Sequence, residues 1–231
     1  MVDPIGKETV LYSFTTSPDG AGPDAGLVRD KAGNFYGTTH GGAFGYGTVF
    51  KLDPSGEETV LHSFTYSDGA FPDAGLIRDK AGNLYGTTSG GDLVCGLQGC
   101  GTVFKVDPSG HETVLHSFTN SPDGAGPYAG LVMDKAGNLY GTTLNGGACG
   151  YGTVFKLDPS GHETVLHSFT NSPDGAGPYA NLVRDKAGNL YGTTEEGGAS
   201  GYGTVFRLTS CGSQQDQSNA EAHDEKCGEE Q

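Results

Sequence analysis

The sequence of 231 residues has no tryptophan, two methionines and few basic side chains. No apolar run approaches the roughly 18 residues that a membrane-spanning helix needs, so we expect no transmembrane segment. Nor is an apolar signal peptide visible at the start of this chain. The 13 lysines and arginines face 28 aspartates and glutamates, a formal net charge of −15. Because such an acidic surface repels phosphate backbones, nucleic acid is excluded as an expected partner.

The sequence contains one segment that occurs in four similar copies. The Tyr-Gly-Thr-Thr element begins at Tyr36, Tyr85, Tyr140 and Tyr191. The Thr-Val-Phe element begins at Thr48, Thr102, Thr153 and Thr204. A fixed period of roughly 50 residues indicates a repeat architecture. Each copy is too short to bury a core of its own, so the copies are expected to pack into one unit.

Within the first full copy, β-branched and aromatic residues predict strands over residues 26–30, 35–39, 47–53 and 58–64. Short turns rich in glycine, asparagine and proline join them, and many of the 41 glycines recur at such turns. Four-stranded meanders at this period are typical of propeller blades. The sequence therefore predicts an all-β, four-bladed β-propeller over residues 8–208, with four antiparallel strands per blade.

The two ends of the repeated region complement each other. Residues 8–14 read Glu-Thr-Val-Leu-Tyr-Ser-Phe and match the last strand of later copies, whereas the fourth copy ends after its third strand. We expect residues 8–14 to supply the missing strand and close the ring. Residues 209–231 read as an acidic, polar tail outside the fold. The predicted blades are 26–64, 75–118, 129–169, and 180–208 joined by 8–14.

The repeated phrase Leu-Val-x-Asp-x-x-Gly-Asn-Leu-Tyr-Gly-Thr-Thr, continued by Gly-Thr-Val-Phe-Lys-Leu-Asp-Pro-Ser-Gly and Thr-Val-Leu-x-Ser-Phe, resembles the GloVer tandem repeat of choice-of-anchor bacterial surface proteins. It is more loosely similar to NHL-type propeller blades. The resemblance covers roughly residues 8–208 and implies a bacterial, extracellular or surface-associated β-propeller. It brings no catalytic residues. Because only four copies are present and no membrane anchor is recognisable, an eight-bladed ring from two chains remains an alternative to one ring per chain.

None of the five cysteines lies at a repeated position. Cys95 and Cys100 bracket an insertion in the second copy, and Cys211 and Cys227 bracket most of the tail. Disulfides 95–100 and 211–227, with Cys149 free, are the simplest pairing and would imply an oxidising compartment. Five unpaired thiols in a cytosolic protein are the alternative. The spacings do not match a structural zinc site.

The loops that differ between copies are the candidate binding face, because variable loops on a rigid frame commonly carry function. Aromatic rings beside carboxylates suit sugar recognition by stacking and hydrogen bonding. In the alternative interpretation the Asp-Gly pairs are turns and the tyrosines pack between blades. The candidate ligand-binding residues are Asp24, His40, Tyr46, Asp73, Tyr128, Tyr151, Tyr179, Glu195, Glu196 and Tyr202.

Two repeated charged positions offer further candidates. Arg29, Arg78 and Arg184 match one another and would bind an anion if they point into an axial channel. Pairing with nearby turn aspartates is the alternative. The equivalent histidines at 62, 116 and 167 fall on outer strands, too far apart to share an ion, and are expected to pack. No cofactor is predicted, although aspartate-rich loops leave calcium open.

Three functions are compatible with these features. The first is a secreted or surface-exposed binding module for a glycan or a partner protein, monomeric as a ring. The second is a propeller-type lyase or hydrolase using asymmetric loop residues, with Glu195, Glu196 and His40 as an acid/base group. The third is a structural repeat protein that self-assembles. No nucleophile elbow, His-Glu-x-x-His, phosphate-loop or dinucleotide motif is present, so the binding module is preferred.

Overall fold

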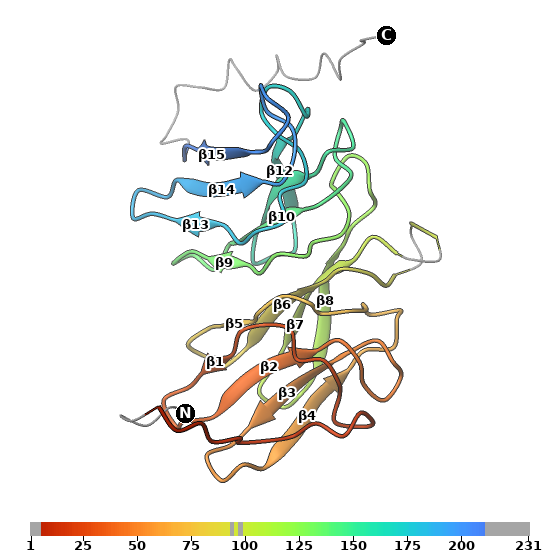
Figure 1. Ribbon diagram of the computed structural model, residues 1–231, viewed down its shortest axis with the longest axis vertical. Coiled ribbons are helices and arrows are strands. Elements are labelled where there is room, and N and C mark those ends of the chain that lie inside the picture. Colours follow the sequence, from red (N-terminus) through yellow and green to blue (C-terminus); the bar gives the residue numbers. More distant parts are fainter. Residues whose placement is uncertain (1–5, 93–94, 97–98, 211–231) are drawn as a thin grey trace.

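The structure is a computed structural model that describes residues 6–92, 95–96 and 99–210. Four antiparallel sheets, one per copy, follow one another along the longest axis of the molecule (Figure 1). The first three sheets are four-stranded meanders and the last has three strands. The strands are β1 (Val28–Arg29), β2 (Phe35–Thr39), β3 (Thr48–Leu52), β4 (Glu58–Ser63), β5 (Ile77–Arg78), β6 (Leu84–Thr88), β7 (Thr102–Val106), β8 (Glu112–Ser117), β9 (Val132–Met133), β10 (Leu139–Thr143), β11 (Thr153–Leu157), β12 (Glu163–Ser168), β13 (Val183–Arg184), β14 (Leu190–Thr194) and β15 (Thr204–Leu208).

The repeated sequence segments fold alike because their strands pair in the same register in each sheet. In the first sheet Thr39 lies opposite Thr48, and their Oγ atoms are 2.7 Å apart. The matching threonine pairs of the other sheets have Oγ atoms 2.8 to 2.9 Å apart. All but one of these eight hydroxyl-bearing residues are fully buried, so each satisfies the other's hydrogen-bonding group. The predicted strands and their antiparallel order are confirmed in the first three copies and for three strands of the fourth. In the first copy the second strand has the predicted bounds, and the other three are shorter by one or two residues at one or both ends.

The hydrophobic core lies between consecutive copies. Three buried clusters occupy the three junctions, and each takes residues from the copy before it and the copy after it. At the first junction the rings of Phe64, after β4, and Phe104, in β7, meet edge to face with centroids 5.0 Å apart. Phe118–Phe155 and Phe169–Phe206 repeat this contact at 5.1 Å. One sheet therefore covers the face of the next, as expected for a unit whose copies cannot fold alone.

The predicted ring closure is absent from the described structure. Residues 8–14 form no strand, and β15 has no partner on its outer edge. The first sheet and the β13–β15 sheet lie at opposite ends of the long axis (Figure 1). The side chain of Val205 in β15 is consequently 83% exposed, whereas the matching Val154 is fully buried. The physical reason is that the missing strand and the following copy are what bury this position in the other sheets.

Residues 8–14 nevertheless lie against the first sheet as a preceding strand would. Phe14 meets Phe50 edge to face, with centroids 5.0 Å apart, which matches the Phe64–Phe104 contact. A Cβ on Gly56 would lie 3.2 Å from the carbonyl oxygen of Leu11, and the other junctions pair Gly110 with Leu61 and Gly161 with Leu115 in the same way. The segment therefore lies where the last strand of an earlier copy would lie, but it is not paired with another strand in a sheet.

The predicted disulfide between Cys95 and Cys100 is present. Cys149 is also disulfide-bonded, so the prediction of a free thiol there is wrong. The predicted pair Cys211 and Cys227 lies outside the described residues, as does most of the predicted tail. The part of the chain that the structure describes contains no helix long and apolar enough to cross a membrane.

Candidate functional site

Two adjacent cavities open on the long loops of the third and fourth copies, and Glu195 lines both. The larger has a volume of about 310 Å³ and is lined by Tyr179, Ala180, Thr193, Thr194 and Glu195. The other has a volume of about 240 Å³ and is lined by Leu144, Asn145, Gly150, Tyr151, Ala176, Gly177, Glu195 and Glu196. Four of the ten candidate ligand-binding residues therefore come together here: Tyr151, Tyr179, Glu195 and Glu196.

The loops that carry these side chains are held by backbone hydrogen bonds. Ala176 and Glu196 exchange two N–H···O bonds, with N···O distances of 2.9 and 3.1 Å. The Glu195 N–H donates to the Gly177 carbonyl at 3.0 Å. Both glutamates directly follow β14, so the strand fixes where their side chains begin. The result is a pair of carboxylates on a braced loop, which favours binding because little backbone ordering remains to be done.

Aromatic rings flank the carboxylates. Tyr179 is 54% exposed and Tyr151 40% exposed. The Tyr179 ring stacks on that of Tyr128, with centroids 5.3 Å apart and planes 20° apart. Neither Glu195 nor Glu196 forms an ion pair within residues 6–92, 95–96 and 99–210. The surface thus offers open ring faces next to acceptors that no protein cation occupies, an arrangement suited to a hydroxylated ligand.

A second group of candidates lies between the first and second copies, and its side chains contact one another. His40 Nδ1 lies 2.8 Å from Asp73 Oδ1, and Ser89 Oγ donates to Asp73 Oδ2 at 2.8 Å. The His40 ring stacks on Phe71, with centroids 4.6 Å apart, and Tyr46 packs edge to face against the same phenylalanine. These side chains hold one another, so fewer of their polar atoms face a ligand.

Sequence reasoning missed Phe71. Its φ is +60°, a left-handed conformation that favours glycine, and the other copies have Gly22, Gly126 or Gly177 at this position with φ between +63° and +67°. A phenylalanine in this conformation carries backbone strain of about 1–3 kcal/mol. The signal was available in the sequence as a break in the repeat, at the only copy without glycine there.

The remaining candidates are not brought together. Tyr202 is 92% exposed and lines neither cavity, and Asp24 is also exposed. His40 follows β2 of the first sheet and Glu195 follows β14 of the last. Figure 1 shows β2 in the lower half of the molecule and β14 in the upper half. In the described structure, these residues therefore do not form the acid/base group that a ring would place together.

The three arginines lie over aromatic rings. The guanidinium carbon of Arg78 is 5.6 Å from the centroid of Tyr36 in the preceding copy, and Arg184 lies at the same distance from Tyr140. Arg29 lies over Phe35 at 5.7 Å. The tyrosine hydroxyls in turn donate to turn aspartates, as Tyr36 does to Asp30 at 3.0 Å. Cation–π contacts at exposed sites contribute about 0.5–1 kcal/mol each, and those of Arg78 and Arg184 link consecutive copies.

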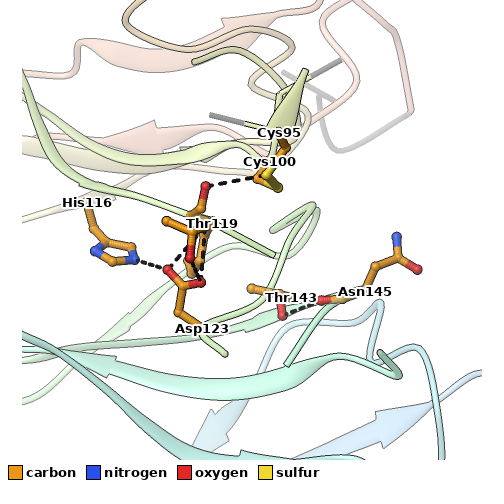
Figure 2. The surroundings of a disulfide bond; sticks show 8 residues. Cys95, Cys100, His116, Thr119, Asp123, Thr143 and Asn145 are labelled. Carbon is orange, nitrogen blue, oxygen red and sulfur yellow. Dashed lines mark hydrogen bonds and ion pairs between the residues drawn. A yellow bond between two sulfur atoms is a disulfide. The ribbon is translucent and has the colours of Figure 1, made fainter. Parts of the chain in front are cut away.

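The aspartate of each Asp-Gly pair closes its loop. Figure 2 shows Asp123 between His116 and Thr119, close to the Cys95–Cys100 disulfide. His116 Nε2 lies 3.0 Å from Asp123 Oδ2, and the Thr119 hydroxyl donates to Oδ1 at 2.6 Å. The matching aspartates at 19, 68 and 174 have the same kind of partners. These carboxylates therefore serve the loop structure, which is the alternative interpretation of the Asp-Gly pairs.

Comparison with known proteins identifies the repeat and the fold. A family model, the Gloeobacter/Verrucomicrobia repeat, matches residues 1–94 and 93–225. No curated protein matches the sequence. Among solved structures, the chain is similar to the extracellular domain of a one-component system of B. thetaiotaomicron, with 17% identity over 80% of this chain and 22% of that chain, at a TM-score of 0.51.

Two enzymes are also similar at comparable levels. A gluconolactonase of Xanthomonas campestris is 18% identical over 78% of this chain and 57% of its own, at a TM-score of 0.49. An endo-arabinanase of Bacillus licheniformis is 14% identical over 85% and 74%, at 0.47. The chain spans less than two thirds of the gluconolactonase and of the extracellular domain. Identities this low show the fold alone, which is all-β and β-propeller-like.

Proposed function

Because the chain belongs to the Gloeobacter/Verrucomicrobia repeat family, we propose that it is a surface-exposed β-propeller binding module whose ligand is a glycan. The ligand lies across the two cavities lined by Tyr151, Tyr179 and Glu195. The structural disulfide supports an oxidising, extracellular location. The net charge of −15 favours a neutral ligand over an anionic one.

The observation that carries this proposal is the juxtaposition of exposed rings and unpaired carboxylates on one braced surface. A sugar ring has an apolar face that stacks on tyrosine and a rim of hydroxyls that donate to carboxylates. Tyr151 and Tyr179 offer rings for the apolar face of the sugar, and Glu195 and Glu196 offer carboxylates for its hydroxyls. Cavities of about 310 and 240 Å³ are each in the size range of one or two sugar units rather than of a protein segment.

A glycan array followed by calorimetry on the best hit tests the proposal. We expect Tyr179→Ala and Glu195→Gln each to weaken binding about tenfold or more, which corresponds to about 1.4 kcal/mol. Phe44→Ala is the control, because Phe44 is an exposed ring that lines neither cavity and lies on the loop of the first copy that corresponds to the Glu195 loop. Absence of binding to every glycan, or equal losses in Phe44→Ala and Tyr179→Ala, would contradict the proposal.

We also propose that the module works as a four-bladed ring over residues 8–208, closed when residues 8–14 pair with β15. The support is that residues 8–14 already lie against the first sheet in the place of a preceding strand, through the Phe14–Phe50 contact. Their sequence repeats that of β4, β8 and β12, each of which pairs with the strand equivalent to β15. Closure would give the fourth sheet the outer strand that the first three sheets already have.

A further inference from the structure

The junction between the first and second copies brings together one imidazole and two carboxylates. His62 lies in β4, Asp68 in the loop that follows β4, and Glu112 at the start of β8 in the next copy. His62 Nε2 and Asp68 Oδ2 are 3.1 Å apart. One potential ligand atom from each of the three side chains lies within 4.8 Å of the others. All three side chains are partly buried, so the group lies at the junction and not on the open surface.

Glu112 is the member of the group whose presence needs an explanation. Its Oε1 atom is buried and has no hydrogen-bond partner. A buried carboxylate without a partner is costly, and the negative charge of Asp68 adds to the cost. Burial raises the pKa of Glu112 to about 7, with His62 acting in the opposite direction to Asp68. The carboxylate therefore lacks a positive charge that a proton or a metal ion would supply.

We propose that His62, Asp68 and Glu112 form a binding site for one divalent transition-metal ion of the Zn²⁺ class. An ion at about 2.0–2.2 Å from imidazole nitrogen and carboxylate oxygen holds its ligand atoms about 3–3.5 Å from one another. The 3.1 Å between His62 Nε2 and Asp68 Oδ2 already fits such a pair, and a carboxylate oxygen of Glu112 lies within 4.8 Å of a ligand atom of each. Water completes the coordination.

The ligand set selects the metal. Calcium and magnesium prefer oxygen ligands in larger number, whereas an imidazole with two carboxylates suits Zn²⁺, Co²⁺, Ni²⁺ or Mn²⁺. Because two of the ligands belong to the first copy and one to the second, a bound ion links consecutive sheets across their junction.

The repeat supplies built-in controls. Tyr12 replaces the histidine at the preceding junction, and its hydroxyl donates to Asp19 Oδ2 at 2.7 Å, so a tyrosine fits this position without a metal ligand. At the last copy His167 lies 2.8 Å from Asp174, but the described chain has no following copy to supply the glutamate. His116, Asp123 and Glu163 repeat the residue types, yet within the described residues only the group at His62 has its ligand atoms within 4.8 Å of one another.

The test is zinc binding by the untagged, chelator-treated full chain, measured by calorimetry with ZnCl₂ and by metal content after desalting. We expect one ion per chain, and at least about a tenfold loss of affinity in His62→Tyr and in Glu112→Gln. His116→Tyr and Glu163→Gln are the matched controls at the next junction and should bind as the wild type does. Circular dichroism checks that all four variants are folded.

Several outcomes overturn the proposal. Absence of zinc binding by the wild type at about 100 μM ZnCl₂ does so, because a three-ligand site is expected to bind more tightly than this. Undiminished binding in His62→Tyr or Glu112→Gln assigns the ion to other histidines. An equal loss in the control variants shows that the effect comes from the junctions in general. This test does not depend on the glycan site, so each proposal can fail while the other holds.

Discussion

At the scale of single residues, the junction carboxylates divide into two kinds. Hydrogen bonds satisfy the aspartates at 19, 68, 123 and 174. Although burial raises the pKa of Asp68, its hydrogen bonds from His62 and Thr65 leave that pKa below its usual range. The glutamates at 58, 112 and 163 each leave a buried Oε1 atom without a partner. The first kind holds a loop, whereas burial disfavours the charged form of the second and raises the pKa of these glutamates.

Glu163 provides a pH-dependent stability that can be measured separately from the zinc site. Burial, and then the charge of Asp123, raises its pKa from 4.5 to about 7. The folded chain therefore holds a proton that the unfolded chain has lost, and this contribution is fully present below about pH 4.5 and is lost as the pH rises through about 7. Urea unfolding of Glu163→Gln should show a gain over the wild type of about 1–2 kcal/mol at about pH 8, and little at about pH 5.

The matched control for this experiment is Glu57→Gln, because Glu57 is an exposed carboxylate in the turn before β4. Its effect on the free energy of unfolding should be the same at both pH values. A Glu163→Gln effect that does not vary with pH would show that the carboxyl is already ionised, and well solvated, in the folded chain.

At the scale of elements, the second strand of each copy contains a glycine that leaves space for a phenylalanine ring. A Cβ on Gly141 in β10 would lie 2.6 Å from the Phe155 ring and 3.0 Å from Leu131. The matching glycines at 37, 86 and 192 would meet the matching phenylalanine and leucine. The glycine in Tyr-Gly-Thr-Thr is therefore required by packing, because the phenylalanine of the neighbouring strand lies directly over it.

We expect Gly141→Ala to lower the free energy of unfolding by about 1–3 kcal/mol, since the added methyl overpacks a closed space. Gly26→Ala is the control: a Cβ at Gly26 has no neighbour within 4 Å, and its φ is not in the left-handed region. Its effect should stay within about 0.5 kcal/mol. Urea denaturation of both variants measures the difference. Similar effects of the two substitutions would mean that the core relaxes around the new methyl.

At the scale of the whole molecule, the two ends of the repeat are each other's complement. Residues 8–14 lack a sheet, and β15 lacks an outer strand. Val205 is 83% exposed, whereas its counterparts Val49, Val103 and Val154 are fully buried, and Val10 is 68% exposed, whereas its counterparts are partly buried. Pairing between the two ends would bury both and satisfy the free backbone groups of β15. The same pairing between two copies of the chain would give a larger ring or an open assembly.

A designed disulfide distinguishes these cases. In the other sheets the valine equivalent to Val205 lies opposite the histidine equivalent to Tyr12, as Val154 lies opposite His167. We therefore expect Tyr12→Cys with Val205→Cys to form an intramolecular disulfide, mapped by mass spectrometry on monomer from size exclusion. The off-register pair Ser13→Cys with Val205→Cys should not, because the residue equivalent to Ser13 lies opposite the residue equivalent to Thr204 and neighbouring residues of the ladder point to opposite faces. A cross-linked dimer, or no cross-link, would contradict the one-chain ring.

The sequence by itself determined the elements of this protein. The four copies, the strands within each copy, their antiparallel order and the Cys95–Cys100 disulfide were all readable, because they depend on local pattern and short spacings. Candidates such as Tyr151, Tyr179, Glu195 and Glu196 were also identifiable, as residues of the loops that vary between copies. Their grouping into neighbouring cavities was not, since it depends on how the third and fourth copies pack.

Only the tertiary structure decided which side chains share a junction. Glu112 meets His62 and Asp68 although it lies about one repeat period further along the chain, and Phe71 meets His40 from another loop. The packing of consecutive sheets sets these distances. Repeated residues look equivalent in sequence, yet Val154 is buried while Val205 is exposed, since burial depends on whether a neighbouring sheet is present. Local pattern determines a strand, whereas its environment is determined by what packs against it.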